Sequence, residues 1–175
     1  MLTDDKAVAH RAKAFGMNVI YHNRSRLASD LEGGARYVSF DELLATSDVL
    51  SLNLSLNPKT RHIISAPEFA RMKDQVVIVN TARGALMNEK DLVAALESGK
   101  VASVGLDVFE NEPQIEASLL KSENAFILPH IGTNTVETQR AMEKLVLRNL
   151  VQAMESGTLI TPIPEQRPQY IDNHR

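Results

Sequence analysis

Cysteine is absent from the sequence, so disulfides, iron–sulfur ligation and thiol catalysis are excluded. There is no excess of positive charge either, because the net charge is -3 and the isoelectric point is near 6.0. A nucleic-acid-binding domain would usually be basic, and we expect none here. The longest apolar runs are a few residues, and the N-terminus lacks the apolar region of a secretory signal. These absences favour a cytoplasmic protein that contacts neither nucleic acid nor a membrane.

The 175 residues are 43% apolar, which is enough for one packed core. Short β-branched runs alternate with helical stretches, and these runs are apolar on both faces. Such runs are typical of a parallel sheet that is covered on both sides. The alternation predicts an α/β fold with a doubly wound parallel sheet and right-handed crossovers. The expected strands are residues 18–21, 48–54, 76–79, 103–109 and 125–128, with a weaker one at 37–38.

Helices are expected between the strands, and capping residues mark several of their ends. Residues 41–46 form a short helix. Ser65 caps the next one, with Pro67 tolerated in its first turn. Asn88 is the N-cap of the helix after that, which stops at Gly99.

The last predicted helix is unusual because it is apolar on two sides. Asn134 and Glu137 form a start that resembles a capping box, and Gly157 ends the helix. A single sheet can cover only one apolar stripe, so we expect the other stripe to pack against another domain or subunit. The stripes are Met142, Leu145 and Val146 on one side, and Leu147, Leu150, Val151 and Met154 on the other.

Three polar side chains follow apolar runs, at the point where each strand ends. Arg83 follows VVIV, Glu112 follows SVGLDVF and His130 follows AFIL. Ligands of open parallel sheets bind at the carboxyl ends of strands, so the three are expected to meet. Arginine can hold a carboxylate, histidine can carry a proton, and glutamate can orient an imidazole. Each residue alone is an ordinary ion-pair, loop or turn residue, but the ordered set suits hydride transfer between a nicotinamide and a 2-oxo acid.

Residues 7–160 resemble the D-isomer-specific 2-hydroxyacid dehydrogenases. The resemblance lies in AVAHRAKAFGMNVIYHNRSR, in VVIVNTARGALMNEKDLVAALESGKVASVGLDVFENEP and in LPHIGTNT. It implies a partial Rossmann-like NAD(P)-binding domain over residues 1–133, and a helix at 134–157 that in relatives packs towards the substrate domain. The proline-containing tail, residues 158–175, is expected to be extended. Relatives usually dimerise through this domain, which implies a homodimer.

The resemblance also implies roles for individual residues. Arg83 binds the carboxylate and carbonyl of a small 2-oxo or 2-hydroxy acid, Glu112 is the partner of the histidine, and His130 is the acid/base. His10, His62 and His174 are spaced too far apart to suggest a metal site. The residues implied to contact the cofactor are Leu54, Ser55 and Thr60 on the adenosine side, Thr81, Ala82 and Arg83 beside the nicotinamide, Asp107 at its carboxamide, and His130, Gly132 and Thr133 at its border.

The residues after the second strand of the fold favour NADP(H). NAD-selective members place an acid there, which bonds the ribose 2′-hydroxyl. Here the sequence after Tyr21 reads His-Asn-Arg-Ser-Arg, with no acid. The two arginines, Arg24 and Arg26, suit a 2′-phosphate together with Ser25 and the adjacent Asn23. This tilts the reaction towards reduction and resembles the glyoxylate/hydroxypyruvate reductase branch. NAD(H) is the alternative, in which Arg24 and Arg26 are only solvated charges.

A dinucleotide fold also needs a first strand and a GxGxxG turn for the pyrophosphate, and the eight glycines include no such motif. According to the resemblance, the second and third glycines of the family's motif would fall at Leu2 and Asp5. We therefore expect an incomplete sheet and a chain of low stability and weak activity. A fragment, a mispredicted gene start, a degenerate protein and half of a split enzyme all fit. The alternative function is a non-catalytic nucleotide-binding or regulatory remnant.

Overall fold

The computed structural model describes residues 3–163, which fall into two compact units. The first unit ends at His130 and the second begins at Ile131. The first unit contains every strand, and the second contains one long helix. The expected tail therefore lies mostly outside the described residues, as does His174.

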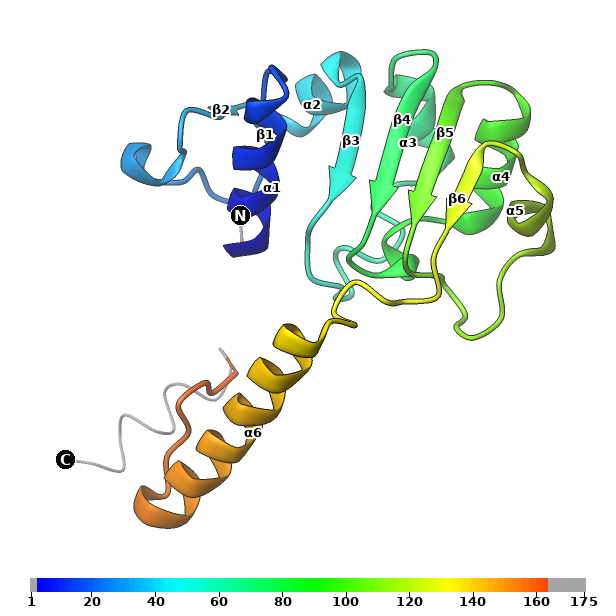
Figure 1. Cartoon of the computed structure of the whole chain (residues 1–175). Helices are drawn as coiled ribbons and strands as arrows, with labels where there is room; N and C mark the ends of the chain where they lie inside the picture. Colours follow the sequence, from blue (N-terminus) through cyan, green and yellow to red (C-terminus); the bar gives the residue numbers. More distant parts are fainter. Residues whose placement is uncertain (1–2, 164–175) are drawn as a thin grey trace. The chain divides into compact units, whose positions relative to one another are not determined.

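The first unit alternates helices and strands, as the sequence predicts (Figure 1). All six expected strands are present, although each differs in length or position from its expected range. The strands are β1 (Ile20–Tyr21), β2 (Arg36–Tyr37), β3 (Val49–Leu52), β4 (Val76–Asn80), β5 (Val101–Leu106) and β6 (Ala125–Ile127). The helices are α1 (Thr3–Ala14), α2 (Phe40–Thr46), α3 (Ala66–Arg71), α4 (Glu89–Glu97) and α5 (Ala117–Lys121), with short 3-10 helices η1 (Ser29–Leu31) and η2 (Gly84–Leu86).

All strand pairs are parallel, and they form two separate sheets. The larger has the order β3-β4-β5-β6, and β1 and β2 form a ribbon of two residues each. Among residues 3–163, no strand joins β1 to β3. The α/β class with a parallel sheet is confirmed.

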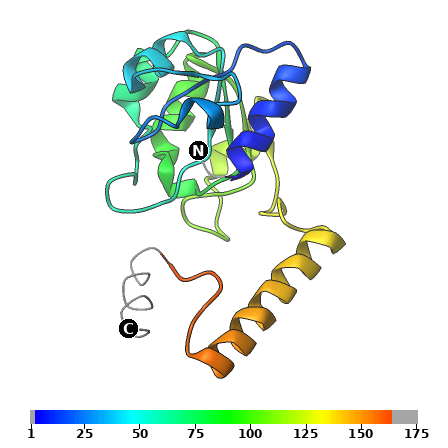
Figure 2. The same ribbon diagram turned by 90° about the vertical axis from the view of Figure 1, so that its left-hand side faces the viewer.

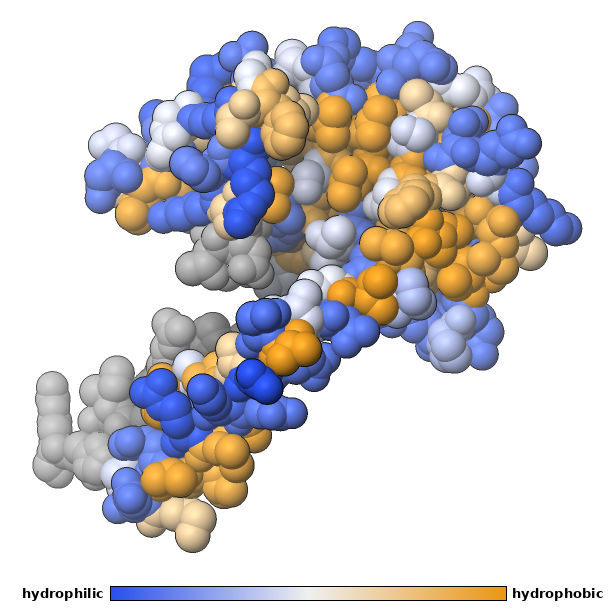
Figure 3. Space-filling view, in the orientation of Figure 1, coloured by the Kyte–Doolittle hydropathy of each residue, from blue (hydrophilic) through white to orange (hydrophobic). Residues whose placement is uncertain are grey.

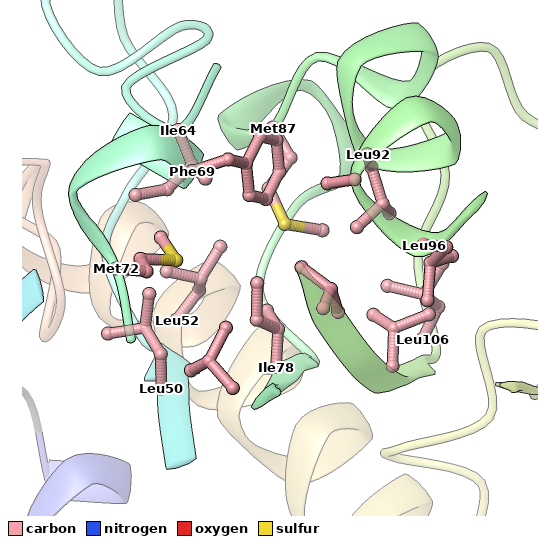
Figure 4. Packing of buried hydrophobic residues seen from close by; sticks show 14 of the residues in the cluster. Leu50, Leu52, Ile64, Phe69, Met72, Ile78, Met87, Leu92, Leu96 and Leu106 are labelled. Atoms are coloured by element: carbon pink, nitrogen blue, oxygen red, sulfur yellow. The ribbon is translucent and has the colours of Figure 1, made fainter. Parts of the chain in front are cut away.

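The core lies between the four-stranded sheet and helices α3 and α4. Side chains alternate along β4, so Val76 and Ile78 are buried on the covered face. Phe69 of α3 and Leu92 of α4 pack into the same cluster (Figure 4). Burying an aliphatic side chain of this size stabilises a fold by ~1.5–3 kcal/mol. This cluster therefore holds the carboxyl ends of β3, β4 and β5 in fixed register.

The other face of the four-stranded sheet is not covered to the same degree. Phe126 pairs with Gly105, which alternates with the buried Val104 and Leu106, so Phe126 points away from the core. Its side chain is 70% exposed, and apolar side chains gather on the face shown in Figure 3. Within residues 3–163, the strongest burial is therefore on the face that α3 and α4 cover, and the edge strand β6 leaves Phe126 exposed on the other. Apolar runs show that a strand suits burial, but they cannot show which segment covers it.

Most of the expected helix ends are confirmed. The Asn88 side chain accepts hydrogen bonds from two amides of the first turn of α4. The carboxylate of Glu68 accepts the backbone N–H of Ser65, as in a capping box, at the start of α3. The last helix, however, is capped by Thr135 and not by Asn134. Thr135 accepts from the Thr138 amide at 3.2 Å, because the chain is already extended there.

The second unit consists of α6 (Val136–Ser156) and the residues up to 163 (Figures 1 and 2). Gly157 ends α6 in the left-handed conformation, as expected. Both apolar stripes are present, and no residue of α6 is buried. Thr161 donates its backbone N–H to Asn149 at 3.1 Å, so this start of the tail folds back along α6. None of the helices within residues 3–163 is long and apolar enough to cross a membrane.

Candidate functional site

The parallel strands bring three of the predicted residues to one edge of the sheet. Arg83 follows β4, Glu112 follows β5 and His130 follows β6. Because β4, β5 and β6 are neighbours in the sheet, their carboxyl ends lie side by side. The core fixes the strands, and the loops that leave them position the three side chains.

His130 and Glu112 form a hydrogen-bonded pair. Nδ1 of His130 lies 2.8 Å from Oε2 of Glu112, and the backbone N–H of Phe109 donates to Oε1 at 2.9 Å. The bond from His130 is the main cause that lowers the pKa of Glu112, followed by the Phe109 amide, and the charges of His130 and Arg83 add to it. An ionised carboxylate only accepts, so the proton of the pair belongs on Nδ1. Nε2 is then free to exchange a proton with a ligand.

The backbone of His130 is itself held in an unusual conformation. Its φ is 55°, in the left-handed region that few residues other than glycine adopt. The side chain is 49% exposed, so burial does not explain the conformation. Strained backbone of this kind is concentrated at functional sites, where it aims a side chain. The conformation therefore supports a role for His130 beyond packing.

Asn80 shapes the turn that presents Arg83. Its side chain is fully buried, donates to the Arg83 carbonyl at 2.9 Å and accepts the Ala82 amide at 3.0 Å. The Arg83 side chain remains exposed, and its charge contributes to the lowered pKa of Glu112. Asn80 was not predicted from the sequence. A polar residue that ends an otherwise apolar strand is the pattern that could have revealed it.

The residues expected at the 2′-phosphate follow β1. Arg26 pairs with Glu32 at 2.8 Å, and the Tyr21 hydroxyl donates to the same carboxylate oxygen at 2.9 Å. Arg24 is exposed, and no hydrogen bond or ion pair within residues 3–163 involves its side chain. The arginine that remains available to a ligand is therefore Arg24, next to Asn23 and Ser25.

The other expected cofactor contacts are spread over four segments of the chain and stay predictions. Leu54, Ser55 and Thr60 lie after β3, where the Thr60 hydroxyl donates to the Ser55 carbonyl at 2.8 Å and closes the loop. Thr81 and Ala82 follow β4, and Asp107, which is buried, follows β5. Gly132 and Thr133 belong to the second unit.

Four charged or titratable residues near the site were not predicted. Glu89 is the first residue of α4, and Glu110 lies in the segment after β5, as Glu112 does. Arg61 and His62 lie in the loop after β3. Arg61 and His62 both contact the Glu110 carboxylate, at 2.8 and 2.7 Å. The sequence did not predict the contact between His62 and Glu110, because the two residues are 48 positions apart. No cluster of three potential metal ligands occurs in the part of the chain that the structure describes.

Residues 5–132 match the family described as "D-isomer specific 2-hydroxyacid dehydrogenase, NAD binding domain". The protein named 4-methyl-2-oxopentanoate reductase A, from Aspergillus oryzae, is 65% identical over 162 residues, which are 93% of this chain and 49% of that protein. This chain thus spans about half the length of the curated relatives that it matches.

Solved structures of reductases are also similar to this chain. A glyoxylate reductase from Paecilomyes thermophila is 68% identical and has a TM-score of 0.90, over 92% of this chain and 49% of that one. An NADPH-dependent glyoxylate/hydroxypyruvate reductase from Sinorhizobium meliloti, in complex with NADP and malonate, is 34% identical with a TM-score of 0.86, over 91% and 49% of the two chains. The family match, over residues 5–132, covers most of the chain. This protein therefore belongs to the D-isomer-specific 2-hydroxyacid dehydrogenase family.

Proposed function

We propose that this chain supplies the cofactor-binding and proton-transfer part of an NADP(H)-dependent reductase of small 2-oxo acids, of the glyoxylate/hydroxypyruvate reductase type. The observation that carries the proposal is the His130–Glu112 pair at 2.8 Å, at the sheet edge where Arg83 also lies. The most similar relatives described above are named as reductases of 2-oxo acids, which supports the same reading. A homodimer and a cytoplasmic location stay predictions.

The chain's own residues suit the two ends of the cofactor. Arg24 is exposed and unpaired within residues 3–163, which suits a 2′-phosphate, and the loops after β4 and β5 suit the nicotinamide. The sequence contains no glycine turn for the pyrophosphate. When bound, the nicotinamide supplies the hydride.

The protein residues would handle the carboxylate and the proton of the substrate. Arg83 would hold the carboxylate of the 2-oxo acid and polarise its carbonyl. His130 would give the proton on Nε2 to the carbonyl oxygen as that oxygen gains electron density. Glu112 would keep the opposite ring nitrogen protonated and stabilise the charged imidazole before the transfer.

Cofactor binding and reduction test the proposal separately. We would measure binding of NADPH and NADH by nicotinamide fluorescence, for the wild type, for Arg24→Asp and for Arg140→Asp as a control on α6. Arg24→Asp should weaken NADPH binding about tenfold or more, since one charge-assisted hydrogen bond is lost, while the control should bind as the wild type does. An unchanged NADPH/NADH ratio in Arg24→Asp would contradict the cofactor assignment.

Reduction of glyoxylate, hydroxypyruvate and 4-methyl-2-oxopentanoate would be followed through loss of NADPH absorbance. His130→Gln should abolish turnover, and His10→Gln, on the exposed side of α1, should not. Turnover that survives in His130→Gln would overturn the proposed chemistry. Tight NADPH binding without any turnover in the wild type would favour the alternative function, a nucleotide-binding regulatory module.

A further inference from the structure

The carboxylate of Glu112 depends on the backbone segment that follows β5. Asp107, Val108 and Phe109 are all buried, so this segment is part of the core and not a free loop. Its amide at Phe109 donates to one oxygen of Glu112, and His130 bonds the other oxygen. Any rotation of the segment would therefore move the carboxylate away from the imidazole.

A second glutamate holds the next amide of the same segment. Glu89 is only 7% exposed, and its carboxylate accepts the backbone N–H of Glu110. Two consecutive amides, those of Phe109 and Glu110, thus donate to two different glutamates. Carboxylates in the first turn of a helix usually face water and only offset the helix dipole. Glu89 instead turns inward to a backbone donor that comes from the loop after β5.

The outer side of the segment is held as well. The Glu110 carboxylate accepts hydrogen bonds from Arg61 and His62, and the His62 amide donates to Ala85 at 2.9 Å. His62 has a φ of 52°, so its backbone is strained in order to reach this position. Glu110 thus connects the segments after β5 and β3, and His62 connects the latter to Ala85 in the segment after β4.

We propose that Glu89 and Glu110 are positioning residues for the His130–Glu112 pair. Glu89 fixes the segment after β5 from the inner side, and Glu110 fixes it from the outer side through Arg61 and His62. The catalytic consequence rests on the proposed function, but the positioning itself is a property of the folded chain. It is therefore testable without turnover.

The first experiment records the ring nitrogen shifts of His130 by NMR, which report the nitrogen that carries the proton. The variants are Glu89→Ala, Glu89→Gln and Glu110→Ala, with Glu97→Ala at the far, exposed end of α4 as the control. In the wild type the proton should reside on Nδ1. Glu89→Ala should move the proton towards Nε2, and Glu110→Ala should do so to a smaller extent. Glu89→Gln keeps an acceptor oxygen and should restore the wild-type pattern.

Two outcomes would overturn the positioning role. The first is an unchanged His130 spectrum in both alanine variants, while Glu112→Gln shifts it. The second is a Glu89→Gln spectrum as perturbed as that of Glu89→Ala, because that would point to charge or general packing. If Glu89→Ala fails to fold, the His130 spectrum of Glu110→Ala alone tests the positioning role. A Glu112→Gln variant that leaves His130 unchanged would show that the pair is not formed in solution, and would remove the basis of the proposed function too.

Kinetics give an independent readout wherever turnover is measurable. A displaced acid/base should lower kcat about tenfold in Glu89→Ala while the KM for NADPH stays the same, since misplacement of reacting groups acts on the chemical step. A rise in that KM with unchanged kcat would contradict the positioning role. If the wild type shows no turnover but the NMR shifts are as expected, the proposed function is contradicted and the positioning role of the two glutamates is still supported.

Discussion

At Gly84, which lies close to the candidate site, the structure leaves no room for a side chain. A Cβ atom there would lie 1.9 Å from the carbonyl carbon of Phe109 and 2.4 Å from the Glu110 nitrogen. Both are backbone atoms, so the segment after β5 would have to shift. We expect Gly84→Ala to lower the free energy of unfolding by ~3 kcal/mol, as for severe overpacking.

Gly105 offers a control for that substitution, since it is another glycine of the first unit whose φ is not positive. A Cβ at Gly105 would meet only the Cγ2 atom of Val79 at 3.9 Å, which is ordinary contact. Gly105→Ala should therefore change stability by less than ~1 kcal/mol in urea unfolding. Equal losses in the two variants would mean that the close approach at Gly84 does not exist in solution.

Glu112 should make stability depend on pH in one direction. Its pKa is lowered, first by the bond from His130, so its ionised form is stabilised in the fold. That contribution is fully present above the ordinary pKa of a glutamate and is lost as the pH falls through the lowered value. Wild type should therefore be more stable than Glu112→Gln at neutral pH, with a gap that closes on acidification. Equilibrium unfolding across this range checks it, with Glu123→Gln as the control.

Glu89 should show the opposite dependence. Burial is the main cause that raises its pKa, so its ionised form is disfavoured in the fold. The fold loses stability as the pH rises from the ordinary glutamate pKa to the raised one. Glu89→Gln should consequently gain stability relative to the wild type over that interval. A difference that does not vary with pH would show that Glu89 titrates as an exposed group.

Single residues were predictable from the sequence where they follow an apolar run. Arg83, Glu112 and His130 each do so, and the structure places them at neighbouring strand ends. Asn80 and Glu89 were not predicted, because they act on backbone atoms. Glu89 binds an amide 21 residues away, and no spacing rule connects a side chain to a distant backbone donor.

The N-cap of helix α4 makes it possible to measure how much a predicted cap contributes to stability. The Asn88 side chain accepts the amides of Lys90 and Asp91, at 3.1 and 3.2 Å. Asn88→Ala should cost ~1 kcal/mol of unfolding free energy, because two donors at the start of the helix lose their acceptor. Asn88→Asp keeps the acceptor and should stay close to the wild type. A loss of the same size in Asn88→Asp would argue that the site depends on the amide and not on capping.

The short elements α5, η1 and η2 were not predicted from the sequence. Helix α5 has five residues, fewer than two turns, so it shows no helical period to detect. The start of α6 was placed one residue early because both Asn134 and Thr135 are good caps, and only the backbone conformation distinguishes them. Longer elements such as β4 and α4 carry enough pattern to be located from sequence alone.

The arrangement of the strands was predictable only in class. Parallel pairing follows from the alternation of strands and helices, and the missing glycine turn implied an incomplete sheet. The sequence did not show that β1 and β2 would form a ribbon apart from β3–β6. Sheet order depends on which edges find partners, and local patterns carry no information about that.

The separation into two sheets predicts uneven stability within the first unit. Val38 and Val104 are matched probes, because each side chain is 2% exposed and each amide donates a parallel-strand hydrogen bond of 2.9 Å. The Val38 amide bonds Tyr21 across a ribbon of two residues per strand, whereas Val104 lies inside the four-stranded sheet and its core. A ribbon of this size is marginally stable by itself.

Hydrogen exchange of these two amides should therefore differ, although their local burial does not. We expect Val38 to exchange at least ~100-fold faster than Val104, because opening the ribbon leaves the larger sheet folded. The amide of Ile78, at the centre of β4, should match Val104. Equal rates for Val38 and Val104 would mean that both sheets open only together. Arg24 lies in the segment that directly follows β1, so in that case the proposed 2′-phosphate contacts would be as rigid as the pair formed by His130 and Glu112.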